Sequence, residues 1–200
     1  GEKLLASTDV HGQFAGIPVV VQAVNALNRT KPMRKLLDGA LHVHPDAWLP
    51  DLATKRFRWS APARKKAPPV VDGERTPGKV AIFSTCYVNY NEPGIGLDLI
   101  KLLQLNDTPY TVVSKESCCG MPKLELGDLE GVAKHKEANI PVLAKYAKEG
   151  FAILTAIPSC TLMFKQEIPL LFPDDPDVKA VQQAMFDPFE YLIARHKDDL

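Results

Sequence analysis

The chain has 200 residues, with 24 acidic and 24 basic side chains, so its formal net charge at neutral pH is zero. This balance argues against a protein that binds nucleic acid through a strongly basic surface. The length is enough for one medium-sized domain with additional segments. The longest apolar stretch, around residues 17–24, is too short to span a bilayer, and no signal peptide is visible, so a cytoplasmic location is expected.

The first 60 residues contain no cysteine and are predicted to form an irregular, partly helical arm. Aliphatic residues favour helices at about 19–28 and 32–40 within this arm. Residues 61–78 are rich in proline, alanine and charged side chains. Because proline fixes φ and lacks an N–H donor, we interpret this stretch as a linker, with a domain boundary near residue 76.

Beyond the linker, short apolar runs alternate with helical periodicity. Strands are predicted at residues 79–83, 110–113 and 151–156. Helices are predicted at residues 93–106, 127–148, 161–171 and 178–195. Strands that alternate with helices predict crossover units, and therefore an α/β fold. We expect a three-layer structure with a mostly parallel sheet and crossover helices, preceded by the N-terminal arm.

Each of the four cysteines follows a predicted strand. Cys86 lies three residues past the first strand, Cys118 and Cys119 about five past the second, and Cys160 four past the third. In a parallel sheet the loops after the strands gather at one edge, where open α/β folds bind their ligands. The sequence therefore predicts that residues more than 70 positions apart meet at one metal or redox site.

The local chemistry around these thiols agrees with a metal site. Structural disulfides are not expected in a reducing compartment, and Gly120 beside the adjacent thiols lets the backbone turn or approach a ligand closely. Cys160 precedes a predicted helix, whose dipole favours the thiolate that binds metal. The two close cysteine pairs of a zinc ribbon are absent. The pattern favours metal ligands or redox groups, with four ordinary thiols or a vicinal disulfide as the alternatives.

Three segments carry a resemblance to a known family. They are residues 86–91 (Cys-Tyr-Val-Asn-Tyr-Asn), 114–122 (Ser-Lys-Glu-Ser-Cys-Cys-Gly-Met-Pro) and 159–161 (Ser-Cys-Thr). They resemble the cysteine-rich CCG domain family, and within it the iron–sulfur proteins related to heterodisulfide reductase and to the C subunit of anaerobic glycerol-3-phosphate dehydrogenase. The family motif is a cysteine, then Cys-Cys-Gly, then Cys-x-x-Cys. Here 31 residues separate Cys86 from Cys118, and 40 separate Cys119 from Cys160.

Two departures from the family pattern bear on the cofactor. Ile157 stands where the final Cys-x-x-Cys has its first cysteine, so the site has four thiols in place of five. A single 4Fe–4S cluster, a zinc ion, or a site completed from elsewhere are all compatible with four thiols. The chain also lacks the closely spaced cysteine run of a bacterial ferredoxin, so ferredoxin-type clusters are not held here.

The resemblance implies an organisation and a function. It implies that residues 1–60 follow a missing ferredoxin-like domain, that residues 79–175 are the CCG domain, and that residues 176–200 lead to a missing second CCG domain. The intact protein is then an iron–sulfur subunit that relays electrons from a flavoprotein dehydrogenase subunit toward quinone. It would sit on the cytoplasmic membrane through partner subunits.

The resemblance implies a metal site built from Cys86, Cys118, Cys119 and Cys160, with Gly120 beside it. Lys115 and Asn89 are further candidates to tune such a site. We find no acid–base pair in the sequence that would make the chain catalytic by itself, and Glu116, Glu125 and Asp128 are interpreted as loop and helix-cap residues. Two other functions stay open: a zinc-stabilised interaction module, and a thiol–disulfide reductase that uses Cys118 and Cys119.

Overall fold

The computed structural model describes residues 7–8, 12, 14–62 and 76–195. A parallel sheet lies at its centre, in the strand order β2-β1-β3-β4. Its strands are β1 (Val80–Ile82), β2 (Tyr110–Val112), β3 (Ala152–Leu154) and β4 (Met185–Phe186). All three pairings are parallel, with Ala81 opposite Thr111 on one side and Ile153 on the other. The predicted parallel α/β fold is confirmed.

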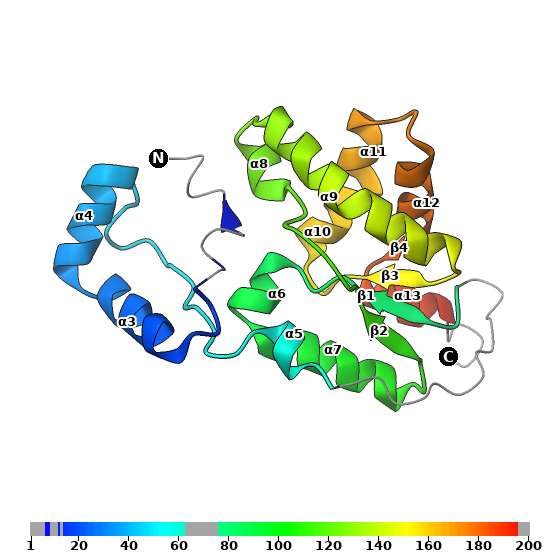
Figure 1. Cartoon of the computed structure of the whole chain (residues 1–200), viewed down its shortest axis with the longest axis horizontal. Helices are drawn as coiled ribbons and strands as arrows, with labels where there is room; N and C mark the ends of the chain where they lie inside the picture. Colours follow the sequence, from blue (N-terminus) through cyan, green and yellow to red (C-terminus); the bar gives the residue numbers. More distant parts are fainter. Residues whose placement is uncertain (1–6, 9–11, 13, 63–75, 196–200) are drawn as a thin grey trace.

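Helices cover both faces of this sheet (Figure 1). One side carries α9, α12 and the continuous helical segment of α10, η1 and α11, while α7 and α13 lie on the other side. The bounds of the helices that follow β1 are α6 (Cys86–Tyr90), α7 (Pro93–Leu105), α8 (Met121–Glu125), α9 (Leu129–Lys148), α10 (Pro158–Leu162), η1 (Met163–Glu167), α11 (Ile168–Leu171), α12 (Pro176–Ala184) and α13 (Pro188–Arg195).

Two hydrophobic clusters make the three layers. Successive strand residues point to opposite faces, so Ala81 and Ile153 join the cluster under α9, whereas Ile82 and Leu154 join the cluster over α7. Strands β1 and β3 are buried at every position, which explains why their sequences are continuous apolar runs, whereas the edge strand β2 is half-buried.

The N-terminal arm contains α3 (Pro18–Asn28), α4 (Lys31–Leu41) and α5 (Phe57–Ser60). The two predicted helices of the arm are therefore present, and they lie to one side of the sheet domain in Figure 1. The short helix α5 instead packs on α7, and Phe57 is fully buried in the cluster on that face. Most of the predicted linker, residues 63–75, lies outside the described residues.

The predicted helix at 178–195 is wrong in its middle. Helix α12 ends at Ala184, β4 follows, and α13 begins at Pro188. Pro188 cannot continue a preceding helix, and it disfavours helical backbone in the residue before it. Met185 pairs with Ile153 of β3 and is 1% exposed, so burial on the sheet replaces the helical turn that local periodicity favoured.

Candidate functional site

The four cysteines lie together at the carboxyl ends of three neighbouring strands. The Sγ atoms of Cys86 and Cys118 are 3.9 Å apart, and those of Cys119 and Cys160 are 3.1 Å apart. All four are free thiols. Because Cys118 and Cys119 are adjacent, the two pairs form one group of sulfur atoms drawn from three segments of the chain.

Cys86 is the first residue of α6, immediately after Thr85. The prediction that it sits in a loop is wrong, because Thr85 caps a helix that starts at the cysteine. The Thr85 Oγ1 atom accepts a hydrogen bond from the backbone N–H of Val88 at 3.2 Å. Thr85 has φ of 65°, a strained conformation for a β-branched residue, at a cost of roughly 1–3 kcal/mol. Such strain persists only where the surrounding structure fixes the backbone, here just before a site cysteine.

The Cys118–Cys119 pair remains in a loop, as predicted, and Gly120 ends it. Gly120 has φ of 98°, which a side-chain-bearing residue rarely adopts, and it is the residue before α8. A Cβ atom there would meet only ordinary neighbours, at 3.4 Å or more. The requirement for glycine at this position therefore comes from the backbone turn that presents the two thiols.

Cys160 lies in the first turn of α10, not before the helix as the sequence predicted. Its N–H donates to the carbonyl of Ile157 at 3.0 Å, because Pro158 starts the helix two residues before the cysteine. Ile157 packs against both hydrophobic clusters, so the position of the missing family cysteine is used for core packing. The Oγ1 atom of the neighbouring Thr161 is buried without a hydrogen-bond partner among the described residues.

The proximity of the thiols changes how readily they ionise. Hydrogen bonds from the Cys119 and Cys86 thiols lower the pKa of Cys118 to about 2, although burial opposes this effect. This value already includes a smaller lowering by the backbone N–H of Gly120. The contact with Cys118 in turn raises the pKa of both Cys86 and Cys119, and burial adds to this. The group therefore favours one thiolate, at Cys118, stabilised by its neighbours.

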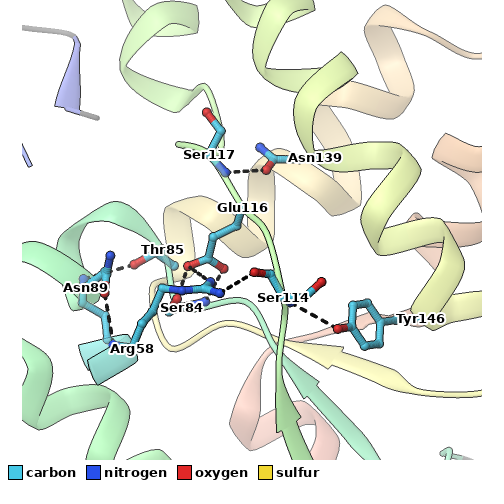
Figure 2. Close-up of polar contacts among 10 residues, drawn as sticks. Arg58, Ser84, Thr85, Asn89, Ser114, Glu116, Ser117, Asn139 and Tyr146 are labelled. Atoms are coloured by element: carbon cyan, nitrogen blue, oxygen red, sulfur yellow. Dashed lines mark hydrogen bonds and ion pairs between the residues drawn. The ribbon is translucent and has the colours of Figure 1, made fainter. Parts of the chain in front are cut away.

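A buried carboxylate connects the chain segments that precede Cys86 and Cys118 (Figure 2). Glu116 accepts a hydrogen bond from the Ser84 N–H at 2.9 Å and another from the Ser84 hydroxyl. Arg58 Nη1 lies 3.2 Å from Glu116 Oε1, and the Glu116 side chain is 8% exposed. Burial raises the pKa of Glu116, and the hydrogen bonds from Ser84 together with the Arg58 charge oppose that rise.

Sequence reasoning missed this role of Glu116, which we interpreted as a loop residue. The sequence did contain an indication of this contact, because Ser84 and Glu116 each stand two residues before a site cysteine. Asp128, in contrast, does cap a helix as expected, since it accepts a hydrogen bond from the N–H of Gly131 at the start of α9.

Asn139, from the middle of α9, fixes the other side of the same loop. Its Oδ1 atom accepts from the Ser117 N–H at 2.8 Å, and its Nδ2 atom donates to the Cys118 carbonyl at 2.9 Å. Asn139 is 1% exposed. The Ser117 hydroxyl also lies 2.9 Å from Nδ1 of His135, one helical turn earlier. Both backbone positions next to the Cys118 thiol are therefore held from α9.

The two tuning candidates from the sequence occupy different places. Asn89 is buried, and its Oδ1 atom accepts from the backbone N–H of Arg58 at 3.2 Å, so it fixes α5 against α6. Lys115 is exposed and lines a cavity beside Cys86. The side chain of Asn89 is thus committed to holding two helices together, while that of Lys115 faces the open side of the site.

The chemistry of the donor set fits an iron–sulfur cluster. Cysteine thiolates are the ligands of such clusters, and four free thiols are present, with the pKa of Cys118 lowered by its neighbours. The unpartnered hydroxyl of Thr161 is a donor beside Cys160, of the kind that tunes clusters by hydrogen bonding to sulfur. Among the residues that the structure describes, no group of three or more His, Cys, Asp or Glu side chains is arranged to hold a single metal ion.

Comparisons with known proteins identify relatives of this chain. Residues 80–165 match the family model of the cysteine-rich domain CCG. The chain is 30% identical over 168 residues to the C subunit of anaerobic glycerol-3-phosphate dehydrogenase from Escherichia coli strain K12, an alignment that covers 83% of this chain and 40% of that protein. No solved structure matches.

Two further relatives align over shorter stretches. The B subunit of fumarate reductase (CoM/CoB) from Methanothermobacter marburgensis is 28% identical over 98 residues, which is 48% of this chain and 19% of that protein. Lactate utilization protein A of Bacillus cytotoxicus is 30% identical over 109 residues, which is 54% of this chain and 44% of that protein. Each alignment therefore spans less than half the length of the relative.

Proposed function

Since residues 80–165 are a cysteine-rich domain of the CCG family, we propose that the chain is an iron–sulfur electron-transfer subunit of a dehydrogenase. The observation that carries this proposal is the gathering of four free thiols, from three strand ends, into two pairs with Sγ separations of 3.9 and 3.1 Å. No other buried group in the described residues combines as many ligands of the type that iron–sulfur clusters use.

The residues of this chain would hold and tune the cluster. Cys86, Cys118, Cys119 and Cys160 are the proposed ligands, and Gly120 adopts the left-handed backbone turn that presents two of them. When bound, the cluster would accept and release single electrons. Each ligand must be deprotonated to bind, and hydrogen bonds from the neighbouring thiols lower the pKa of Cys118 in that direction. The Thr161 hydroxyl, which is buried without a partner among the described residues, is the candidate donor of a hydrogen bond to a cluster sulfur atom.

Four ligands support a single 4Fe–4S cluster, because one cysteine per iron completes that cluster. The fifth cysteine of the family motif is replaced by Ile157, whose side chain packs against the hydrophobic core. Isoleucine at position 157 therefore removes a possible ligand near Cys160, and its side chain contributes to the hydrophobic core.

The partners are proposed from the relatives. Two of them carry names that make them subunits of a dehydrogenase and of a reductase. We propose that a flavoprotein dehydrogenase subunit supplies electrons to this chain and that quinone receives them, at the cytoplasmic membrane, through partner subunits. In the described part of the chain, no helix combines the length and apolar character needed to cross a membrane.

The domain organisation of the intact protein is also a proposal. We propose an N-terminal arm over residues 1–60 that follows a ferredoxin-like domain, a linker at 61–78, the CCG domain at 79–175, and a lead-in at 176–200 to a second CCG domain. The support for further domains is that the alignment covers only 40% of the length of the glycerol-3-phosphate dehydrogenase C subunit.

A zinc ion held by Cys86 and Cys118, with its site completed from elsewhere, is the second candidate, and one distance favours it. Two thiolates bound to one tetrahedral zinc ion lie roughly 3.8 Å apart, given zinc–sulfur bonds of about 2.3 Å. The Sγ atoms of Cys86 and Cys118 are separated by 3.9 Å. A structural zinc would make the chain an interaction module without a redox role.

Metal and sulfide analysis of the anaerobically purified chain separates the two candidates. We expect about four iron and four acid-labile sulfide atoms per chain, with broad visible absorption that bleaches on reduction. Serine replacement of each cysteine in turn should lower the iron content, while the matched control Ser159→Ala, beside Cys160, should keep it. A colourless protein with one zinc and no sulfide would reject the electron-transfer proposal.

A further inference from the structure

A cavity of about 390 Å³ opens beside Cys86. This volume lies within the range of pockets that bind small molecules. Of the four cysteines, Cys86 alone is partly exposed, and it alone lines the cavity. We call the cavity the Cys86 pocket and define it by Arg56, Arg58, Trp59, Cys86, Lys115 and Glu116.

Positive charge predominates in the wall of the Cys86 pocket. Three cationic side chains face one carboxylate there, although the whole chain has no net charge. The carboxylate is Glu116, which is 8% exposed and already engaged by Ser84 and Arg58. A cavity with this balance attracts an anion and disfavours a cation.

The two guanidinium groups are held in place by the protein itself. Arg56 donates from Nε to the carbonyl of Ala15 at 2.7 Å, and its guanidinium lies 4.7 Å from the centre of the Trp59 ring. Arg58 donates from Nη2 to the carbonyl of Ser114 at 2.7 Å. Because these contacts already order both side chains, a ligand would lose little affinity to their immobilisation.

Guanidinium groups match the planar, two-oxygen edge of carboxylates and phosphates. Lys115 adds a third charge at the rim, and within the described residues it makes no ion pair. We propose that the Cys86 pocket binds a small organic anion through a carboxylate or phosphate group. This goes beyond electron transfer, because it assigns a ligand site that places the anion against the one partly exposed thiol of the group.

Calorimetric titration of the anaerobically purified chain tests the proposal. The probes are citrate for the carboxylate arm, inorganic phosphate for the phosphate arm, and glycerol as an uncharged control. Ionic strength is held constant with sodium chloride, since screening alone alters surface electrostatics. We expect saturable binding at one site for at least one anion and no binding of glycerol. Absence of binding by both anions would overturn the proposal.

A matched pair of lysine variants locates the site. Lys115→Gln should weaken binding about tenfold, equivalent to about 1.4 kcal/mol. Lys179→Gln, an exposed lysine on α12, should leave binding unchanged. The chain has two tryptophans, so Trp48→Phe makes Trp59 the single reporter, and its fluorescence should titrate with the same midpoint. Equal weakening by both lysine variants would show non-specific charge attraction and refute the pocket. These readouts do not depend on which metal the thiols hold, so this proposal and the proposed function can fail separately.

Discussion

Glu116 and Ser84 join the two segments that lead into Cys118 and Cys86, through the Ser84 N–H at 2.9 Å from Glu116 Oε2 and through the Ser84 hydroxyl. Each of these residues precedes its cysteine by two positions. The contact spans 32 residues of sequence, so it fixes the two segments in relation to each other. We infer that Glu116 sets the spacing of the Cys86 and Cys118 sulfur atoms.

Glu116→Gln tests this role. The amide keeps the size of the side chain but replaces one acceptor oxygen with a donor, which leaves Ser84 or Arg58 without its partner. We expect a loss of about 1–3 kcal/mol in the free energy of unfolding, measured by urea denaturation, and a lower iron content. Glu125→Gln, on the exposed side of α8, is the control. Unchanged stability and iron content in Glu116→Gln would contradict the inference.

Asn139 is predicted to protect the loop at Cys118. Asn139→Leu keeps a similar volume but removes both hydrogen bonds, to the Ser117 N–H and to the Cys118 carbonyl. Since these backbone groups would be buried without partners, we expect about 2–4 kcal/mol of destabilisation. The Cys118 thiol should also react faster with a thiol reagent in the metal-free chain. Lys134→Gln, at an exposed ion pair on the same helix, should change neither measurement.

Thr161→Val should separate a tuning role from a packing role. The hydroxyl of Thr161 is buried without a partner among the described residues, so its removal should leave stability unchanged or raise it by about 1 kcal/mol. If the hydroxyl donates to a cluster sulfur atom, the reduction potential of the variant should fall, because that hydrogen bond stabilises the reduced cluster. Thr161→Ser should retain the original potential. A redox titration that gives the same potential for Thr161→Val would exclude the tuning role.

The ion pair between Lys136 of α9 and Asp175 predicts a pH dependence of stability. The hydrogen bond from Lys136 lowers the pKa of Asp175, and the same contact raises the pKa of Lys136. The lowered pKa means that the contribution of Asp175 is present above its ordinary pKa and is lost as the pH falls. The raised pKa means that the contribution of Lys136 is present below its ordinary pKa and is lost in strong alkali.

Asp175→Asn isolates this pair, because asparagine can still cap α12 as Asp175 does through the N–H groups of Asp177 and Val178. We expect the variant to be less stable by about 2 kcal/mol at neutral pH, with a difference that disappears in strong acid. Thermal unfolding between acid and neutral pH measures it. Asp98→Asn, at an exposed pair, is the control. A deficit that is independent of pH would point to lost capping and not to the ion pair.

Order along the chain was enough to establish the parallel α/β fold and the edge at which the cysteines gather. Strands buried on both faces must be apolar throughout, and a cysteine placed shortly after such a strand must lie near its carboxyl end. Both facts depend on residue type and position in the chain, so they can be read without coordinates. The loop at Cys118 and the helix at α9 follow from the same kind of local pattern.

Three-dimensional packing was needed to learn which thiol lies beside which, and what holds them there. The pairing of Cys86 with Cys118, the hydrogen bonds of Glu116 and Asn139, and the arginine-lined cavity all join segments 21 or more residues apart. Strand β4 was missed for the same reason, since Met185 gains more from burial against Ile153 than from another helical turn. Local periodicity indicates which face of its own helix or strand a residue lies on. Side-chain contacts between distant segments depend instead on how the helices pack against the sheet.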